Sequence, residues 1–213
     1  MLPELHRRQP YPLSWAEQEK LFTELPTHLK SMALFAVHTG CRDQEICRPG
    51  WDWEVKIEQM PALVVFIVPG PLVKNGQDRL IVCNHIARSV IEEQRDKDPN
   101  YVFGYRTRAL HHMLNHGWRK ARERAGLPMV RVHDLKHTFG RRLHAAGVSF
   151  EDRQDLLGHR SARITTHYSG AELHNLYEAA NKVCQGSDQK MTVTVLALKT
   201  NRPALDQTWE HST

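Results

Sequence analysis

A tyrosine and a histidine in the C-terminal third of the chain have side chains that could act together on a phosphate ester. His159 ends the sequence Leu157-Gly158-His159, and Tyr168 follows nine residues later. A tyrosine hydroxyl, with a pKa of about 10, must lose its proton as it attacks, so a nearby histidine is a suitable helper. The pair predicts nucleophilic attack by Tyr168 on a phosphodiester, with His159 beside it.

Further side chains could supply the other groups that strand cleavage without a metal needs: Arg42, Lys74, His133 and Lys136. Arg42 could bind the non-bridging phosphate oxygens through its two-pronged guanidinium group. Lys74, in a predicted hairpin connection, could protonate the leaving 5′ oxygen. His133 and Lys136 are three residues apart, so on a helix they share one face and could both point at the same phosphate.

Each of these residues also has an ordinary structural explanation. Tyr168 could be an amphipathic tyrosine at the start of a helix. Arg42 could pair with Glu45 across one helical turn. Lys74 could be a solvent-exposed hairpin residue, and His133 could cap a helix or be a satisfied core histidine. Only the ordered set favours a catalytic interpretation.

The positive charge of the chain is concentrated in one segment. The net charge is +5, and between Arg106 and Arg142 ten Lys or Arg stand against two acids, so the rest of the chain carries −3. A basic surface beside candidate catalytic groups indicates a polyanionic partner, of which double-stranded DNA is the obvious one. The alternative is a solvated helix surface over 119–124.

The composition is that of one intracellular globular domain. The chain has 213 residues, of which 40% are hydrophobic, and is too short for two large domains. Its longest apolar run, Ala62 to Val68, has the length of a strand and not of a membrane span. The N-terminal residues lack the apolar core of a signal peptide, so we expect a cytoplasmic location. The four cysteines lack paired CxxC spacing and are expected to be reduced.

Periodicity and turn residues predict a mainly α (α+β) domain with a small three-stranded antiparallel β-sheet insert. A capping box at Ser14 opens a first helix to about Leu25, and Thr27 could cap a second that stops at Gly40. A helical turn is expected over 42–47, and strands over 51–57, 62–68 and 79–83. Further helices are expected over 84–96, 107–125, 133–146, 149–157 and 170–184, with Thr107 and Ser149 as caps, and a last strand could form over 191–198. The divisions are a lead-in over 1–13, a domain over 14–184 with its insert at about 51–83, and a tail over 185–213.

The ordered set of candidate residues resembles the catalytic domain of the tyrosine recombinase (phage integrase) family. The resemblance runs from about Ser14 to Cys184 and is carried by five short motifs in order. They are Thr39-Gly40-Cys41-Arg42 with Glu45, Lys74-Asn75-Gly76 with Arg79, His133-Asp134-Leu135-Lys136-His137, Leu156-Leu157-Gly158-His159, and Thr165-Thr166-His167-Tyr168.

The resemblance implies site-specific cleavage and rejoining of DNA through a 3′-phosphotyrosyl intermediate. Tyr168 would be the nucleophile, Lys74 the general acid and His133 the general base. Arg42, position 136 and His159 would hold the phosphate. No metal or other cofactor is implied.

The resemblance also implies a tetramer on two DNA duplexes. The apolar spacing of residues 170–184 suits docking on a neighbouring subunit, and suits burial against the chain's own core equally well.

Two departures from the family pattern have consequences. Lys136 stands where the family usually has arginine, and it keeps the charge but loses the planar two-pronged contact. The hypotheses are a competent but weakened site, or a local adjustment that accommodates the lysine. The helical DNA-clamping domain that precedes the catalytic domain in most relatives is missing from this sequence, so weak DNA binding by the chain alone is expected.

Other interpretations remain beside the recombinase. Relaxation of supercoiled DNA in the manner of a type IB topoisomerase uses a similar set of residues. A catalytically dead DNA-binding remnant would also fit Lys136. His111, His112 and His116, and the pair His133 and His137, raise the question of a metal site, but the glutamate of an HExxH motif is absent. The first three are expected on a polar helix face near the DNA.

Overall fold

The computed structural model describes residues 8–73, 76–105, 108–159 and 168–184. The helices of this part of the chain are α1 (Trp15–Glu24), α2 (Thr27–Thr39), α3 (Asp43–Cys47), α4 (His85–Gln94), α5 (His116–Arg124), α6 (Val132–Ala145), α7 (Phe150–Leu157) and α8 (Gly170–Asn181). The strands are β1 (Glu54–Val55), β2 (Val64–Val68), β3 (Arg79–Cys83), β4 (Gly104–Tyr105) and β5 (Arg108–Ala109). The mainly helical fold with a three-stranded antiparallel sheet, β1-β2-β3, is therefore confirmed.

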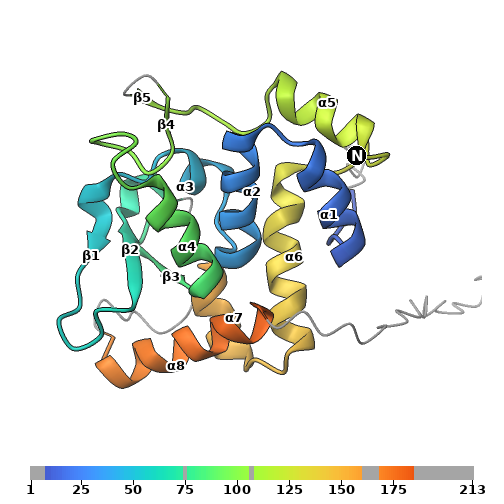
Figure 1. Ribbon diagram of the computed structural model, residues 1–213. Coiled ribbons are helices and arrows are strands. Elements are labelled where there is room, and N and C mark those ends of the chain that lie inside the picture. The colour runs from blue at the N-terminus through green and yellow to red at the C-terminus, as the bar shows by residue number, and fades with distance from the viewer. Residues whose placement is uncertain (1–7, 74–75, 106–107, 160–167, 185–213) are drawn as a thin grey trace, which may run out of the picture.

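The central helix α2 is buried on nearly all sides. It packs against α6 and α4 and also contacts α1, on which α5 packs, while the sheet lies on the other side (Figure 1). Ala33, Phe35 and Ala36 are completely buried, as expected for a helix that is apolar all round. Gly40 ends the helix in a left-handed conformation, with φ of 62°, and turns the chain toward Arg42.

The three-stranded sheet lies between two hydrophobic clusters. Val64, Phe66 and Val68 of β2 belong to the cluster around α2, whereas Val65 belongs to a second cluster formed with α6, α7 and α8. Because alternate residues of a strand point to opposite faces, one strand serves both clusters. Helices on both faces of the sheet thus hold the β2–β3 connection in place at its base.

Most of the predicted helix boundaries agree with the structure. Ser14 caps α1 through a capping box with Glu17, and Ser149 caps α7. The cap of α2 is Pro26, and Thr27 is its first helical residue. The strand predicted over 51–57 is shorter than expected, since residues 51–53 form a 3-10 turn and only β1 pairs with β2.

The helix predicted over 107–125 is wrong in its first half. The helix begins at His116 with Asn115 as its cap. Thr107, the predicted cap, lies outside the described residues. Residues 108–109 instead pair with 104–105 in a two-stranded sheet. Asn115 accepts a hydrogen bond from the backbone N–H of Trp118 at 3.1 Å, and burial of Trp118 fixes this late start. The expected helix face of His111, His112 and His116 is therefore wrong for the first two, which precede the helix.

Helix α8 packs on the chain's own core. Leu176 and Ala180 are buried in the second cluster. The Asn84 side-chain amide donates to the carbonyl oxygen of Ala180 at 3.1 Å, and the Asn181 side chain accepts from the backbone of His85 at 3.0 Å. Of the two expectations for residues 170–184, the structure shows burial in the same chain. The strand predicted over 191–198 lies outside the described residues.

In the described part of the chain, none of the helices has the length and apolar character needed to cross a membrane.

Candidate active site

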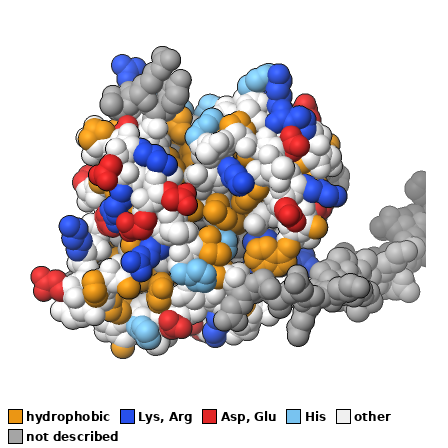
Figure 2. Space-filling view, in the orientation of Figure 1, with side chains coloured by type: hydrophobic (Ala, Val, Ile, Leu, Met, Phe, Trp, Pro, Cys, Tyr) orange, Lys and Arg blue, Asp and Glu red, His pale blue; other side chains and the backbone are white. Residues whose placement is uncertain are grey.

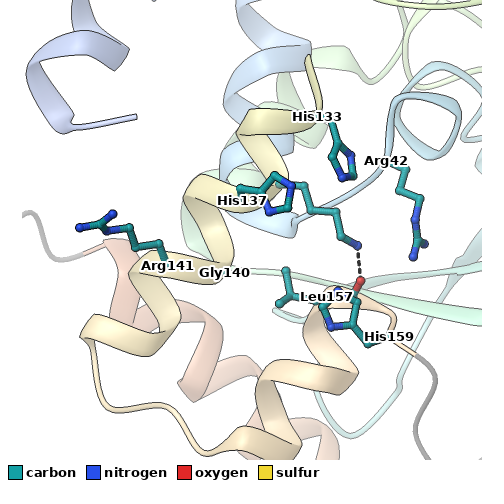
Figure 3. Close-up of a pocket in the computed structure, with 8 residues that line it drawn as sticks. Arg42, His133, His137, Gly140, Arg141, Leu157 and His159 are labelled. Carbon is teal, nitrogen blue, oxygen red and sulfur yellow. Dashed lines mark hydrogen bonds between the residues drawn. The ribbon is translucent and has the colours of Figure 1, made fainter. Parts of the chain in front are cut away.

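A pocket of about 400 Å³ opens where the start of α3, the first turns of α6 and the end of α7 meet (Figure 3). Its described walls are Arg42, His133, Lys136, His137, Gly140, Arg141, Leu157 and His159. Among these residues none carries a carboxylate, and six carry a basic or imidazole side chain. Such a pocket favours an anion.

Arg42 is fixed by the carboxylate of Glu45. One oxygen of Glu45 accepts from the Arg42 backbone N–H at 2.6 Å, and the other accepts from the Arg42 guanidinium at 2.8 Å. The guanidinium also lies 3.4 Å from the carbonyl oxygen of Gly158. The predicted pairing of Arg42 with Glu45 is therefore present. It orients the arginine without closing the pocket, because the Arg42 side chain keeps 26% of its exposure.

The first turns of α6 present three side chains to the pocket. His133 and His137 are one turn apart, and their rings meet edge to face with centroids 4.7 Å apart. Asp134 fixes the start of this helix by accepting from the backbone N–H of Arg131 at 2.8 Å. The expectation that His133 and Lys136 share a face directed at one space is met. Burial lowers the pKa of both His133 and His137.

Lys136 is the most deeply buried cation of the pocket. The residue is 4% exposed, and its ammonium group donates to the carbonyl oxygen of Leu157, the last residue of α7 (dashed line in Figure 3). Burial, with help from the positive charges of Arg79 and Arg42, lowers the pKa of Lys136 to about 6. The lysine thus has one carbonyl partner and two neighbouring cations.

His159 lies at the rim of the pocket. Gly158 ends α7 in a left-handed conformation with φ of 57°, which directs the chain across the pocket. The His159 backbone N–H closes this turn on the carbonyl oxygen of Gln154 at 2.9 Å. Partial burial, followed by the charges of Lys136 and Arg42, lowers the pKa of the His159 ring.

The charges of the pocket depress one another's protonation. The pKa of Lys136, of His133 and of His159 is lowered first by burial and then by neighbouring cations, and Arg42 contributes in all three. An anion in the pocket would reverse this repulsion and favour the charged forms. The arrangement can therefore take up a phosphate group and a proton together.

Tyr168 is not among the residues that line the pocket. It precedes the cap of α8 and packs half-buried against the second hydrophobic cluster. Burial, together with the carboxylates of Asp155 and Glu172, raises the pKa of Tyr168 to about 12. The structure thus brings together Arg42, His133, Lys136 and His159, while Tyr168 lies apart in a setting that disfavours the phenolate. Lys74 lies outside the described residues.

Some of the basic side chains between Arg106 and Arg142 make contacts with other parts of the same chain. Arg124 forms an ion pair with Glu24 at 2.6 Å, and Arg142 stacks on the Trp15 ring with its guanidinium carbon 3.4 Å from the ring centroid. Arg119 and Lys120 remain exposed on α5. Figure 2 shows Lys and Arg side chains gathered where α5 lies, interspersed with acidic ones. The solvated-surface interpretation therefore holds for part of this segment.

A sequence profile of the phage integrase family matches residues 13–197. The chain belongs to the phage integrase family.

Two curated relatives of this integrase-family chain give the same assignment. The integrase of Salmonella phage P22 is 28% identical over 180 residues, which are 78% of this chain and 45% of the P22 protein. Tyrosine recombinase XerA of Pyrococcus furiosus is 28% identical over 192 residues, 84% of this chain and 64% of XerA. The chain thus spans between about half and two thirds of the relatives it matches.

Solved structures share the fold. The integrase of mycobacterium phage Brujita superposes with a TM-score of 0.65 at 22% identity, over 85% of this chain and 60% of that one. The XerH site-specific recombinase, bound to a palindromic difH substrate in a post-cleavage complex, superposes with a TM-score of 0.56 at 20% identity, over 79% and 52%.

Several residues that line the pocket were not predicted from the sequence. His137, Gly140 and Arg141 also line the pocket, although the side chain of Arg141 points away from the others in Figure 3. The spacing of four between His133 and His137 was a usable signal for a shared helix face. The sequence could not indicate that the carbonyl oxygen of Leu157 accepts from Lys136, because every residue has a backbone carbonyl. Within the described residues no group of three or more His, Cys, Asp or Glu side chains is arranged so that it could hold a metal ion.

Proposed function

We propose that this chain cleaves and rejoins DNA strands at specific sites, with the phosphate held in the pocket between α3, α6 and α7. The observation that carries the proposal is the convergence of Arg42, His133, Lys136 and His159 on one space without an acidic wall among the described residues. Membership of the phage integrase family supports it, as does the likeness in fold to a recombinase solved on its DNA substrate. The proposed partner is double-stranded DNA.

The proposed reaction exchanges one phosphodiester bond for another and therefore needs no external energy source. The Tyr168 oxygen attacks the phosphorus, loses its proton to His133, and forms a 3′-phosphotyrosyl bond. The bond to the 5′ oxygen breaks, and Lys74 protonates that oxygen as it leaves. Arg42, Lys136 and His159 bind the non-bridging oxygens, whose charge grows in the transition state. Attack by a 5′-hydroxyl on the phosphotyrosine reverses these steps and rejoins a strand.

Cleavage by this scheme requires Tyr168 to approach the pocket. In the structure its hydroxyl group belongs to a side chain packed on the second cluster, and its raised pKa disfavours attack from there. We therefore propose that the structure is a resting state. When DNA binds, its phosphate fills the pocket, and this phosphate is the group that Tyr168 then attacks.

The test is covalent trapping on nicked duplex DNA that covers the flanks of the gene. The wild-type chain should form a protein–DNA adduct that Tyr168→Phe does not form, while both bind the DNA equally. DNA binding without an adduct in either protein would contradict cleavage and leave a DNA-binding module. An adduct at unrelated sequences, with relaxation of supercoiled plasmid, would favour the topoisomerase-like activity instead.

A further inference from the structure

Arg79 is a charged residue placed in the interior of the fold. It is the first residue of β3, pairs with Val68 of β2, and is 3% exposed. A guanidinium group is costly to bury unless a carboxylate and carbonyl oxygens satisfy it. Its partners should therefore reveal why an arginine stands here.

The Arg79 guanidinium joins the ends of two helices to one carboxylate. It forms a buried ion pair with Glu45. Its other terminal nitrogen, Nη2, donates to the carbonyl oxygens of Gly40 at 3.0 Å, Thr39 at 3.4 Å and Leu156 at 3.3 Å. These carbonyls lie at the ends of α2 and α7, where a helix leaves its last carbonyl oxygens without an intrahelical partner.

Both helix ends lead directly into the pocket. Arg42 follows the last residue of α2 by three positions, and His159 follows the last residue of α7 by two. The Glu45 carboxylate that binds Arg79 also orients Arg42, through contacts of 2.6 and 2.8 Å. Arg79 itself is not among the residues that line the pocket. It lies behind the pocket and donates hydrogen bonds to the ends of the two helices, α2 and α7, that precede Arg42 and His159.

The end of α7 is closely fitted to this arginine. A Cβ atom added to Gly158 would lie 2.5 Å from Cδ of Arg79 and 3.0 Å from its Cζ. A glycine is thus needed for the helix end to approach the guanidinium. The contact fixes how far the end of α7 stands from the Arg42 segment.

We propose that Arg79 is a positioning residue, which sets the separation of Arg42 and His159 by binding both helix ends and Glu45 at once. The inference rests on the proposed function, because it assumes that the two residues share one phosphate. Lysine cannot replace this arginine, since a single ammonium nitrogen lacks the planar fork that reaches a carboxylate and several carbonyls. Arg79→Lys therefore keeps the charge and removes the geometry.

Arg95→Lys is the control for the loss of a guanidinium ion pair away from the pocket. Arg95 also forms an ion pair, with Glu54 at 2.6 Å, but neither residue lines the pocket. The first measurement needs no DNA: inorganic sulfate is titrated into each protein while the histidine ring signals are followed by NMR, with the His159 signal assigned from His159→Gln. Arg79→Lys should bind sulfate about tenfold more weakly and shift the His159 signal. Arg95→Lys should match the wild type in both.

The second measurement is the rate constant of adduct formation at saturating nicked DNA, with melting temperatures alongside. Arg79→Lys should slow the reaction about 10²-fold, while folded protein of both variants still binds DNA. Sulfate affinity and a His159 signal equal to those of Arg95→Lys would overturn the positioning role, whatever the activity.

A wild-type protein that binds sulfate but forms no adduct would remove the proposed cleavage function alone. The comparison of Arg79→Lys with Arg95→Lys would still decide the role of Arg79. If Arg79→Lys does not fold, Arg79→Gln replaces it in the same titration, because the amide retains hydrogen bonds to carbonyl oxygens without the charge. Unchanged sulfate binding by Arg79→Gln would likewise overturn the proposal.

Discussion

The ammonium group of Lys136 donates a hydrogen bond to the carbonyl oxygen of Leu157, 21 residues further along the chain. The bond joins the face of α6 that carries His133 to the last residue of α7. Lys136 therefore lines the pocket and also ties two of its walls together. An arginine at this position would have to satisfy the same carbonyl and would have donors left over for a phosphate.

Lys136→Arg should accelerate strand cleavage. The guanidinium adds a second donor toward the phosphate, and we expect a gain of about tenfold, or ~1.4 kcal/mol in the activation free energy. The measurement is the rate of adduct formation on nicked DNA, with Lys136→Met as the control that removes the charge and should lower the rate. An unchanged rate in Lys136→Arg would mean that the site is already adapted to lysine.

Binding of an anion to the pocket should take up a proton. The pKa of Lys136 is lowered to about 6, so above that pH the free site holds a neutral amine, and a bound anion favours its charged form. Affinity for sulfate, which does not titrate in this range, should therefore fall as the pH rises above about 6. His133, His137 and His159 face the same space, and burial lowers the pKa of each ring.

Calorimetry in buffers of different ionisation enthalpy measures this proton uptake, which we expect to be about one proton per sulfate. Lys136→Met should bind sulfate with less proton uptake, since only the histidines of the pocket remain to take up a proton. The stability of the protein should also depend on the protonation of Lys136, but it should rise with pH where sulfate affinity falls. The pKa of Lys136 in the folded protein lies below the ordinary lysine value of 10.5. The unfolded chain therefore binds more protons between the two values, and the free energy of unfolding rises with pH there.

Gly158→Ala should destabilise the protein and slow cleavage together. The position has φ of 57°, and a Cβ there would overlap Arg79. Gly147→Ala is the control, because it has φ of 70° with nothing within 4 Å of the added atom. The control should cost about 1 kcal/mol of unfolding free energy for the backbone alone, and Gly158→Ala about twice that. Denaturant unfolding measures both, and equal costs would argue against a tight fit at Arg79.

Asp155→Asn should make Tyr168 easier to deprotonate. Tyr168 has its pKa raised to about 12 by burial first and by the Asp155 carboxylate second, so removing that charge lowers the pKa. The measurement is a pH titration of the ultraviolet absorbance of the phenolate. The difference between Asp155→Asn and the same variant with Tyr168→Phe isolates the signal of Tyr168. No displacement of that titration would show that the charge of Asp155 does not contribute to the raised pKa.

Spacing and residue type were sufficient to predict the four pocket residues that the structure brings together. Arg42 follows a glycine stop, His133 and Lys136 share a helix face, and His159 follows a second glycine stop, so local rules place each of them. Their convergence came from the resemblance in motif order. Local rules could not provide it, because α2 and α6, which pack against each other, are far apart in sequence.

The errors have two physical causes. In the basic stretch before His116, charged residues suit a helix surface, yet pairing of 108–109 with 104–105 and the cap at Asn115 took precedence. Tyr168 does not line the pocket, because its ring packs on the second hydrophobic cluster, and a separation of nine residues from His159 does not fix a side chain in space. Buried arginines such as Arg79 are hard to predict because their partners are backbone carbonyls from other helices.

The pairing of Val68 with Arg79 separates the part of the chain that positions the pocket from the connection between β2 and β3. The backbone N–H of Gly70 is bound by the Asp78 carboxylate at 2.7 Å, which closes the base of the β2–β3 connection next to that pair. Insertions or deletions between Val73, which is buried in the core, and Gly76 lie beyond this closure and should leave Arg79 and the helix ends where they are. The length of this connection is therefore something that evolution or an engineer could vary without rebuilding the pocket.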